Sequence, residues 1–147
     1  ILLCSREKAS QLNLPVIASL GYFSNTGISP EIMGAAPIQA IEKCLKKQNW
    51  KASELDVLES NEAFAAQALA VLDAVGVDPK KVNPSGGAIA LGHAIGASGC
   101  RILVTLIHHM KRNQLKKGIA ALCIGGGEGV ALAVTTTDTS MPLVGPW

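Results

Sequence analysis

The chain has few aromatic residues, few charged residues and no long apolar run. Aromatic residues make up 3% of its 147 residues and charged residues 16%, whereas apolar residues reach 48%. A formal net charge of only +2 without a basic block argues against a nucleic-acid-binding protein. No apolar run approaches the roughly 20 residues that a membrane-spanning helix needs. This composition is typical of a compact α/β domain whose strands are buried on both faces.

The four cysteines form no closely spaced pair. They stand at positions 4, 44, 100 and 123, too far apart in sequence for the ligand clusters of a zinc site. We expect reduced and mostly buried thiols and no bound metal. The N-terminus lacks the apolar core of a secretory signal, and it begins at Ile1 without an initiator methionine. We therefore expect a piece of a longer cytoplasmic protein.

Apolar periodicity and turn residues predict alternating strands and helices. One domain is expected over residues 1–137, with an irregular tail at 138–147. Helices are expected at 37–49, 61–76 and 100–111, and the second of these is so apolar that it should be buried on most sides. A glycine-rich loop should fill 83–99. Strands are expected at 15–21, 56–60, 119–124 and 130–136, with a further one around Cys4. This order predicts an α/β fold with a partly parallel sheet and an antiparallel edge.

Three polar or reactive side chains follow predicted strands or lie in glycine-rich turns, where ligand sites of α/β folds gather. They are Asn61, His93 and Cys123. Each also has a structural interpretation, because Asn61 could cap the following helix, His93 could be a structural histidine, and Cys123 could be packing material. The spacing of Gly87 and Gly92 matches a phosphate-binding loop, but the Lys and Ser/Thr that should follow are absent.

A run of glycines follows Cys123 in the stretch ALCIGGGEGVALAV, residues 120–133. Four glycines within five residues interrupt two apolar strands, although glycine weakens a strand. Such a cluster indicates a turn in which bare backbone is needed.

Four stretches together resemble the C-terminal half of a thiolase, most closely the biosynthetic acetyl-CoA acetyltransferases. They are IMGAAPIQA (32–40), NEAFA (61–65), GGAIALGHAIGASG (86–99) and CIGGGEG (123–129). Their order and spacing are specific to the family, and the resemblance extends to about residue 135. It implies a thiolase-like fold in which a five-stranded mixed β-sheet carries helices on both faces.

The resemblance also implies catalytic roles. His93 would activate a nucleophilic cysteine and help to bind the thioester oxygen. Cys123 would be the acid/base that takes a proton from the methyl group of acetyl-CoA. A water held by Asn61 would complete one oxyanion hole with His93, and the backbone N–H of Gly125 would help to form a second.

Met33 and Phe64 match family positions that line the acyl and pantetheine pocket, although either could be plain core. Two residues depart from the family pattern near these sites. Ala94 replaces the proline that usually follows the histidine, which removes a constraint on that loop. Glu128 stands where an uncharged residue is usual, so we expect its carboxylate to point away from the oxyanion site.

The family's nucleophilic cysteine lies in the N-terminal half, and none of the four cysteines here sits in that motif. We therefore expect the isolated chain to be inactive and to need an N-terminal thiolase half. A coenzyme A thioester would be its substrate without a further cofactor, and the whole protein would be a homo-oligomer, a dimer or tetramer. The alternatives are a 3-ketoacyl-CoA thiolase of fatty-acid degradation and a non-catalytic acyl-CoA- or lipid-binding domain of the same fold.

Overall fold

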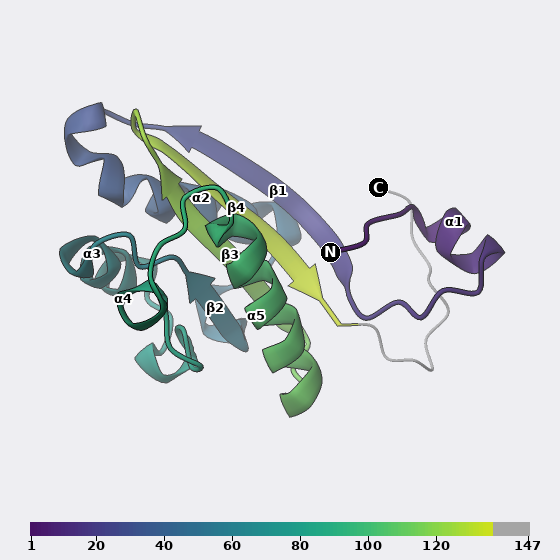
Figure 1. Ribbon diagram of the computed structural model, residues 1–147. Coiled ribbons are helices and arrows are strands. Elements are labelled where there is room, and N and C mark those ends of the chain that lie inside the picture. The colour runs from purple at the N-terminus through teal and green to yellow at the C-terminus, as the bar shows by residue number, and fades with distance from the viewer. Residues whose placement is uncertain (137–147) are drawn as a thin grey trace.

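The computed structural model describes residues 1–136, which form a mixed sheet covered by helices (Figure 1). The sheet has the order β1-β4-β3-β2. β2 and β3 are parallel, whereas β4 is antiparallel to both β1 and β3. The predicted partly parallel sheet with an antiparallel edge is confirmed. The strands are β1 (Ser19–Gly27), β2 (Val57–Ser60), β3 (Lys117–Ile124) and β4 (Glu128–Thr135).

The prediction of five strands was wrong, because the part of the chain that the structure describes contains four. No strand forms around Cys4, and beside β2 only a single parallel bridge joins Leu58 to Val82 within the described residues. The next residue, Asn83, has a φ of 46° and pairs with Ser60 through its side chain. Its Oδ1 accepts from Ser60 N at 2.8 Å and its Nδ2 donates to Ser60 O at 2.8 Å. A side chain thus replaces the backbone ladder, and the strand goes no further.

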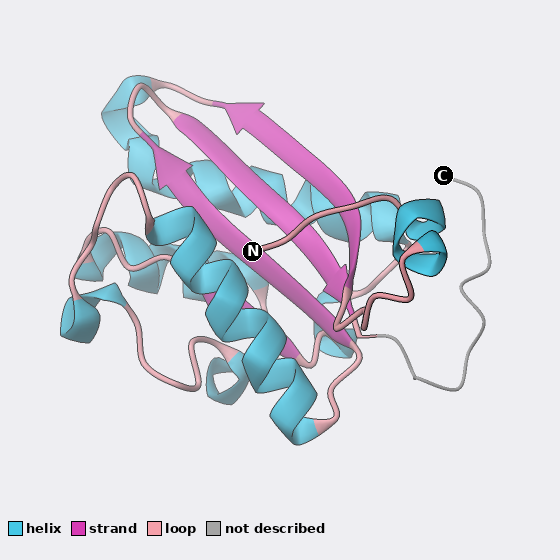
Figure 2. Cartoon of the chain, turned by 45° about the vertical axis from the view of Figure 1, so that its right-hand side comes forward, coloured by secondary structure: helices cyan, strands magenta, loops and turns pink. Residues whose placement is uncertain are grey.

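The helices cover both faces of the sheet, as predicted (Figure 2). α2 packs against β1, β4 and β3 and also contacts α3, whereas α5 packs against β3 and β2. The α-helices are α1 (Arg6–Gln11), α2 (Ala36–Gln48), α3 (Ala65–Val75), α4 (Ala88–Leu91) and α5 (Ser98–Asn113). The 3₁₀ helices are η1 (Pro30–Ala35), η2 (Ala52–Glu54) and η3 (Pro79–Lys81). None of these helices is long and apolar enough to cross a membrane.

The segment before β1 differs from the expected strand around Cys4. Ser5 caps a short helix there, its side chain accepting from Lys8 N at 3.2 Å. Cys4 is exposed, and α1 stands apart from the helices that cover the sheet (Figure 1). The strand expected at 15–21 begins only at Ser19 and runs on to Gly27. An N-cap and an acidic first turn (Glu7) thus outweighed the short apolar start.

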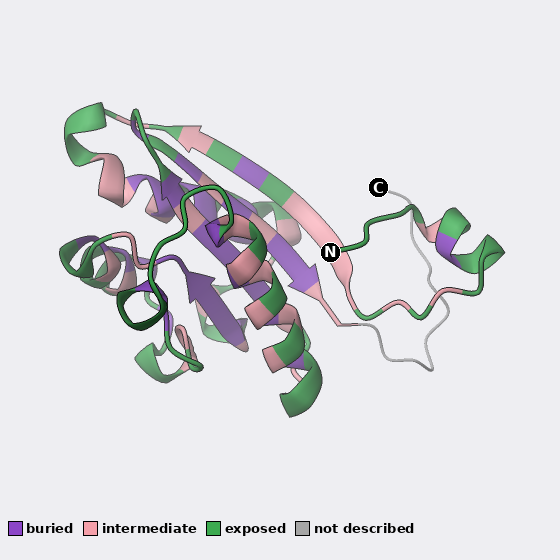
Figure 3. Ribbon diagram, viewed as in Figure 1, coloured by how far each residue is buried: buried purple, intermediate pink, exposed green. Residues whose placement is uncertain are grey.

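Two apolar clusters form the core, one on each face of the sheet (Figure 3). The α5 cluster contains Ile102, Leu106 and Met110, the stripe expected from their spacing of four, packed on Val57 and Ala120. The other cluster joins α2 and α3 to the opposite face. Its members include Ile41, Leu55, Leu58, Val71 and Ile119.

Two further predictions need correction. α3 begins at Ala65 rather than Asn61, and its buried residues are only Gln67, Val71 and Val75, while Leu69 is 65% exposed. An alanine- and leucine-rich helix can thus leave much of its surface uncovered. The predicted loop at 83–99 contains the short helix α4 and the start of α5. The predicted tail at 138–147 lies outside the described residues.

Candidate active site

Asn61 and Cys123 lie at the same edge of the sheet. Because β2 and β3 are parallel, their carboxyl ends meet there. Asn61 follows β2 directly, and its backbone N–H donates to Ala121 O at 2.9 Å. Cys123 lies two residues beyond Ala121 on β3. Ligand sites of α/β sheets form at such carboxyl ends.

His93 reaches this edge from the loop between α4 and α5. Its Nε2 lies 3.5 Å from Asn61 Nδ2, and its Nδ1 lies 2.6 Å from the hydroxyl of Ser98, the first residue of α5. Asn61 is fully buried, whereas His93 is exposed. The structure therefore brings together two of the predicted site residues, with the imidazole open to an incoming substrate.

The hydrogen bonds around His93 define its tautomer. Ser98 Oγ donates to Ala94 O at 3.0 Å, so the same hydroxyl must accept from His93 Nδ1–H. The other ring nitrogen, Nε2, is then unprotonated in the neutral imidazole. It faces the Asn61 amide N–H and can accept a proton.

The carboxylate of Glu62, the residue after Asn61, holds the glycine-rich loop over the site. Glu62 Oε2 accepts from Ile89 N at 3.0 Å, and Oε1 accepts from Asn83 Nδ2 at 3.4 Å. A Cβ at Gly87 would overlap the Glu62 carboxylate. The glycine at this position leaves room for that carboxylate between the loop and the end of β2.

Cys123 is buried and 7% exposed, and this burial raises the pKa of its thiol. Along β3 Cys123 lies on the same face of the sheet as Ile119 and Ala121, which belong to the α2 and α3 cluster. Within residues 1–136 its thiol makes no hydrogen bond to Asn61 or His93. The structure thus places Cys123 at the site edge without joining it to the other two.

The prediction of mostly buried thiols holds for only two of the four cysteines. Cys44 and Cys123 are buried, and Cys4 and Cys100 are exposed. Cys44 lies on the buried face of α2, and its Sγ contacts Tyr22 O at 3.3 Å. Burial raises the pKa of Cys44 to about 11. That thiol is inert at neutral pH, so it is packing material.

The glycines after Cys123 have two different explanations. Gly126 and Gly127 adopt φ of 88° and 94°, which side chains with a Cβ resist. At Gly127 a Cβ would also collide with Ile28 O, and Ile28 N donates to Gly127 O at 2.8 Å. Gly125 has neither constraint, because an added Cβ there would meet nothing within 4 Å. Only Gly125 lacks a structural reason to be glycine, which leaves its predicted role in an oxyanion hole open.

The two residues expected to line the acyl pocket are less buried than Asn61 and Cys123. Met33 is half-buried in η1, which contacts β3, β4 and α3 at the site edge. Phe64 stands before α3 and is 62% exposed, so it is not a core residue. Its N–H lies 3.5 Å from Gln67 Oε1.

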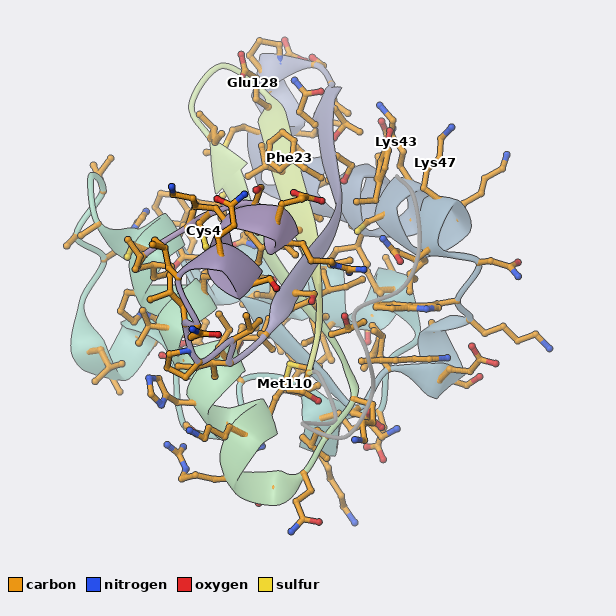
Figure 4. All side chains as sticks on the ribbon, turned by 90° about the vertical axis from the view of Figure 1, so that its right-hand side faces the viewer. Cys4, Phe23, Lys43, Lys47, Met110 and Glu128 are labelled. Carbon is orange, nitrogen blue, oxygen red and sulfur yellow. The ribbon has the colours of Figure 1, made fainter. Side chains whose placement is uncertain are left out.

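Asn61 does not cap a helix, because α3 begins only after Phe64. Glu128 is exposed at the start of β4, as expected for a carboxylate directed to solvent (Figure 4).

The sequence analysis missed an ion pair behind Asn61 whose carboxylate is buried. Glu59 is fully buried in β2, and its Oε2 lies 3.8 Å from Arg101 Nη1 of α5. Burial raises the pKa of Glu59 to about 7, against the opposing effect of the Arg101 charge. Arg101 Nη2 in turn donates to Asn61 Oδ1 at 3.5 Å. A charged residue within a short strand expected to be buried, directly after Val57 and Leu58, was the signal that could have revealed this pair.

The chain belongs to the thiolase family. The family model described as "Thiolase, C-terminal domain" matches residues 14–136. The chain is 58% identical over 134 residues to an acetyl-CoA acetyltransferase of Chromobacterium violaceum and 52% identical to a probable acetyl-CoA acetyltransferase of Escherichia coli K12. Each match covers 91% of this chain and 34% of the relative, so the chain spans about a third of their length.

Solved structures of the family share the fold. The acetyl-CoA acetyltransferase of Bacillus anthracis superposes with a TM-score of 0.88 at 49% identity, and human mitochondrial 3-ketoacyl-CoA thiolase with 0.88 at 40%. Both comparisons cover 90% of this chain and 34% of the other. The family and fold inferred from the four sequence stretches are thus confirmed. The roles of the individual site residues stay predictions.

Proposed function

We propose that this chain carries the acid/base side of an acetyl-CoA C-acetyltransferase, which joins two acetyl-CoA molecules to acetoacetyl-CoA or cleaves that product. The observation that carries the proposal is the pairing of His93 with Asn61 at the sheet edge where Cys123 lies. Identity to the acetyl-CoA acetyltransferases supports the substrate class. The nucleophilic cysteine would come from outside residues 1–147.

In the first half-reaction, His93 Nε2 takes the proton of the nucleophilic thiol. The resulting thiolate attacks the carbonyl carbon of acetyl-CoA and forms a tetrahedral intermediate. Collapse of this intermediate breaks the bond to the sulfur of coenzyme A, and the departing thiolate recovers the proton from His93. The products are an acetyl-enzyme and free coenzyme A. The unprotonated Nε2 of the neutral tautomer suits the first of these proton transfers.

In the second half-reaction, the Cys123 sulfur removes a proton from the methyl carbon of a second acetyl-CoA. The carbanion attacks the acetyl carbonyl carbon, and expulsion of the enzyme thiolate releases acetoacetyl-CoA. In cleavage, Cys123 gives the proton back to the same carbon. Because burial raises the pKa of this thiol, Cys123 is a stronger base once it is deprotonated and holds its proton near neutral pH for the cleavage step.

Negative charge develops on oxygen in both halves and must meet positioned donors. A water held by Asn61 would donate to the enolate oxygen, joined by His93 Nε2 when the imidazole is protonated, while the N–H of Gly125 would serve the tetrahedral intermediate. An added Cβ at Gly125 would meet nothing within 4 Å, so the space beside this residue is open to a substrate. Met33 and Phe64 would line the acyl and pantetheine channel, and the exposed ring of Phe64 fits this role.

The chemistry needs no metal or cofactor besides the coenzyme A thioester. We further propose an N-terminal thiolase half as the partner, a homo-oligomeric whole protein and a cytoplasmic location. A 3-ketoacyl-CoA thiolase is the second candidate, because the human mitochondrial 3-ketoacyl-CoA thiolase matches with the same TM-score of 0.88. Its lower identity, 40% against up to 58% for the acetyltransferases, favours the acetyl-specific reaction.

A chimera tests the proposal. In the Bacillus anthracis acetyl-CoA acetyltransferase, the matching third is replaced by residues 14–136 of this chain. We expect this chimera to form acetoacetyl-CoA from acetyl-CoA, and the 147-residue chain alone to neither form it nor gain an acetyl group by intact-mass spectrometry. A stoichiometric acetyl adduct on the isolated chain would show that one of its own cysteines is the nucleophile. A folded but inactive chimera that still binds acetyl-CoA would favour the non-catalytic binding domain.

A further inference from the structure

The ion pair of Glu59 and Arg101 adjoins the candidate site but has no role in the proposed chemistry. Glu59 is fully buried, and neither of its carboxylate oxygens has a hydrogen-bond partner within residues 1–136. Arg101 Nη1, at 3.8 Å, is the cation that faces it. A buried carboxylate costs free energy unless a positive charge compensates it. Arg101 is thereby held at one position on the first turn of α5.

From that position Arg101 reaches the Asn61 amide. Its Nη2 lies 3.5 Å from Asn61 Oδ1, on the opposite side of the amide from His93. A guanidinium has five donors and no acceptor. The amide oxygen must therefore face Arg101, and the amide nitrogen must face His93.

The same direction of hydrogen-bond donation continues from the Asn61 amide to the His93 ring. The Asn61 NH₂ group can only donate, so His93 Nε2, at 3.5 Å, must accept. The proton of the neutral ring then resides on Nδ1, which donates to Ser98 Oγ at 2.6 Å, and Ser98 donates to Ala94 O at 3.0 Å. Every donor in this chain of contacts points the same way, starting from Arg101.

We propose that Arg101 is a positioning residue, which fixes the orientation of the Asn61 amide and thereby keeps His93 Nε2 free to accept a proton. Without Arg101 the amide can rotate by half a turn and present Oδ1 to the ring. The Ser98 hydroxyl can then turn to donate to Nδ1, and the ring proton moves to Nε2. The effect of Arg101 on turnover rests on the proposed function, whereas its effect on the His93 tautomer does not.

The test measures the His93 tautomer by ¹⁵N NMR at about pH 8.5, roughly two units above the pKa of a free imidazole. Arg101→Met removes the guanidinium but leaves Glu59 buried without its cation, which can unfold the domain. The double variant Glu59→Gln/Arg101→Met removes both charges and avoids this. Arg112→Met is the matched control, since Arg112 lies exposed in the last turn of the same helix.

We expect the unmodified chain and Arg112→Met to carry the proton on Nδ1, and the double variant to show a mixture of both tautomers. In the active chimera the double variant should lower kcat by about ten- to a hundredfold, as for a misplaced catalytic group, and leave KM nearly unchanged. An unaltered tautomer in the folded double variant, or an unaltered kcat in the active chimera, would overturn the proposal. If the unsubstituted chimera is inactive although the tautomer responds to Arg101, the proposed function fails and the positioning of His93 stands.

Discussion

The buried carboxylate of Glu59 gives the folded chain a pH dependence that one substitution should remove. Its pKa is raised from 4.5 to about 7, first because burial disfavours the charged form. Between these two values the folded state therefore binds more protons at this position than the unfolded state does. The free energy of unfolding must then fall as the pH rises from about 4.5 to about 7.

The size of the effect follows from the difference between the two pKa values. Each unit corresponds to about 1.36 kcal/mol, so ionisation of Glu59 costs the folded state up to about 3 kcal/mol. Glu59→Gln is nearly isosteric and neutral at every pH, so it should abolish this contribution. His109 acts in the opposite direction, because burial lowers its pKa, but it is present in both proteins and cancels in their difference.

Urea unfolding measured at about pH 4.5 and about pH 8 provides the assay. The stability of the native chain relative to Glu59→Gln should fall by about 2–3 kcal/mol between these two conditions. If the two proteins lose or gain stability in parallel, Glu59 is ionised throughout, and the Arg101 charge compensates its burial fully. That result would refute the reasoning.

Further predictions concern the cysteines and the glycine turn. Iodoacetamide at about pH 8 should alkylate the exposed Cys4 and Cys100 readily and leave Cys44 unmodified until the chain unfolds. The reason is that burial raises the pKa of Cys44 to about 11. Equal alkylation rates at all three cysteines, measured by peptide mass spectrometry, would contradict this. Gly127→Ala should destabilise the domain by about 1–3 kcal/mol, since it combines a φ of 94° with a collision at Ile28, whereas Gly125→Ala should stay within about 0.5 kcal/mol. Gly125→Val should slow acyl transfer in the chimera without lowering its melting temperature, and a loss of activity that only follows the folded fraction would make Gly125 structural.

Much of the fold could be predicted because the periodicity of apolar residues agrees with the turn and capping residues along most of the chain. Pro37 at the start of α2, the α5 stripe with Leu106 at its centre, and the β3–β4 hairpin all express strong local signals. The strand expected around Cys4 could not be excluded from the sequence, because the helix found after it depends on the Ser5 side chain, which accepts from Lys8 N. The exposure of α3 was missed because burial depends on which neighbours the rest of the fold supplies.

The candidate site could likewise be predicted only in part from the sequence. Motif spacing led to Asn61, His93 and Cys123, and the parallel pairing of β2 with β3 explains why two of them share an edge. The pair of Glu59 and Arg101 was missed, because neither residue belongs to a local pattern of polar residues and their contact arises only when α5 packs on β2. Ser98 lies within the stretch 86–99, but nothing in that stretch indicated that its hydroxyl contacts His93 Nδ1.

The assignment of Cys123 as the acid/base is the central claim, and intact-mass spectrometry on the chimera tests it most directly. A chimera carrying Cys123→Ala is incubated with acetyl-CoA, and both the enzyme mass and the acetoacetyl-CoA formed are measured. If Cys123 is the acid/base, the acetyl-enzyme should accumulate, since His93 and the nucleophile are intact. Condensation should fall by at least about a hundredfold. Near-normal formation of acetoacetyl-CoA, or a folded variant that no longer becomes acetylated, would contradict it.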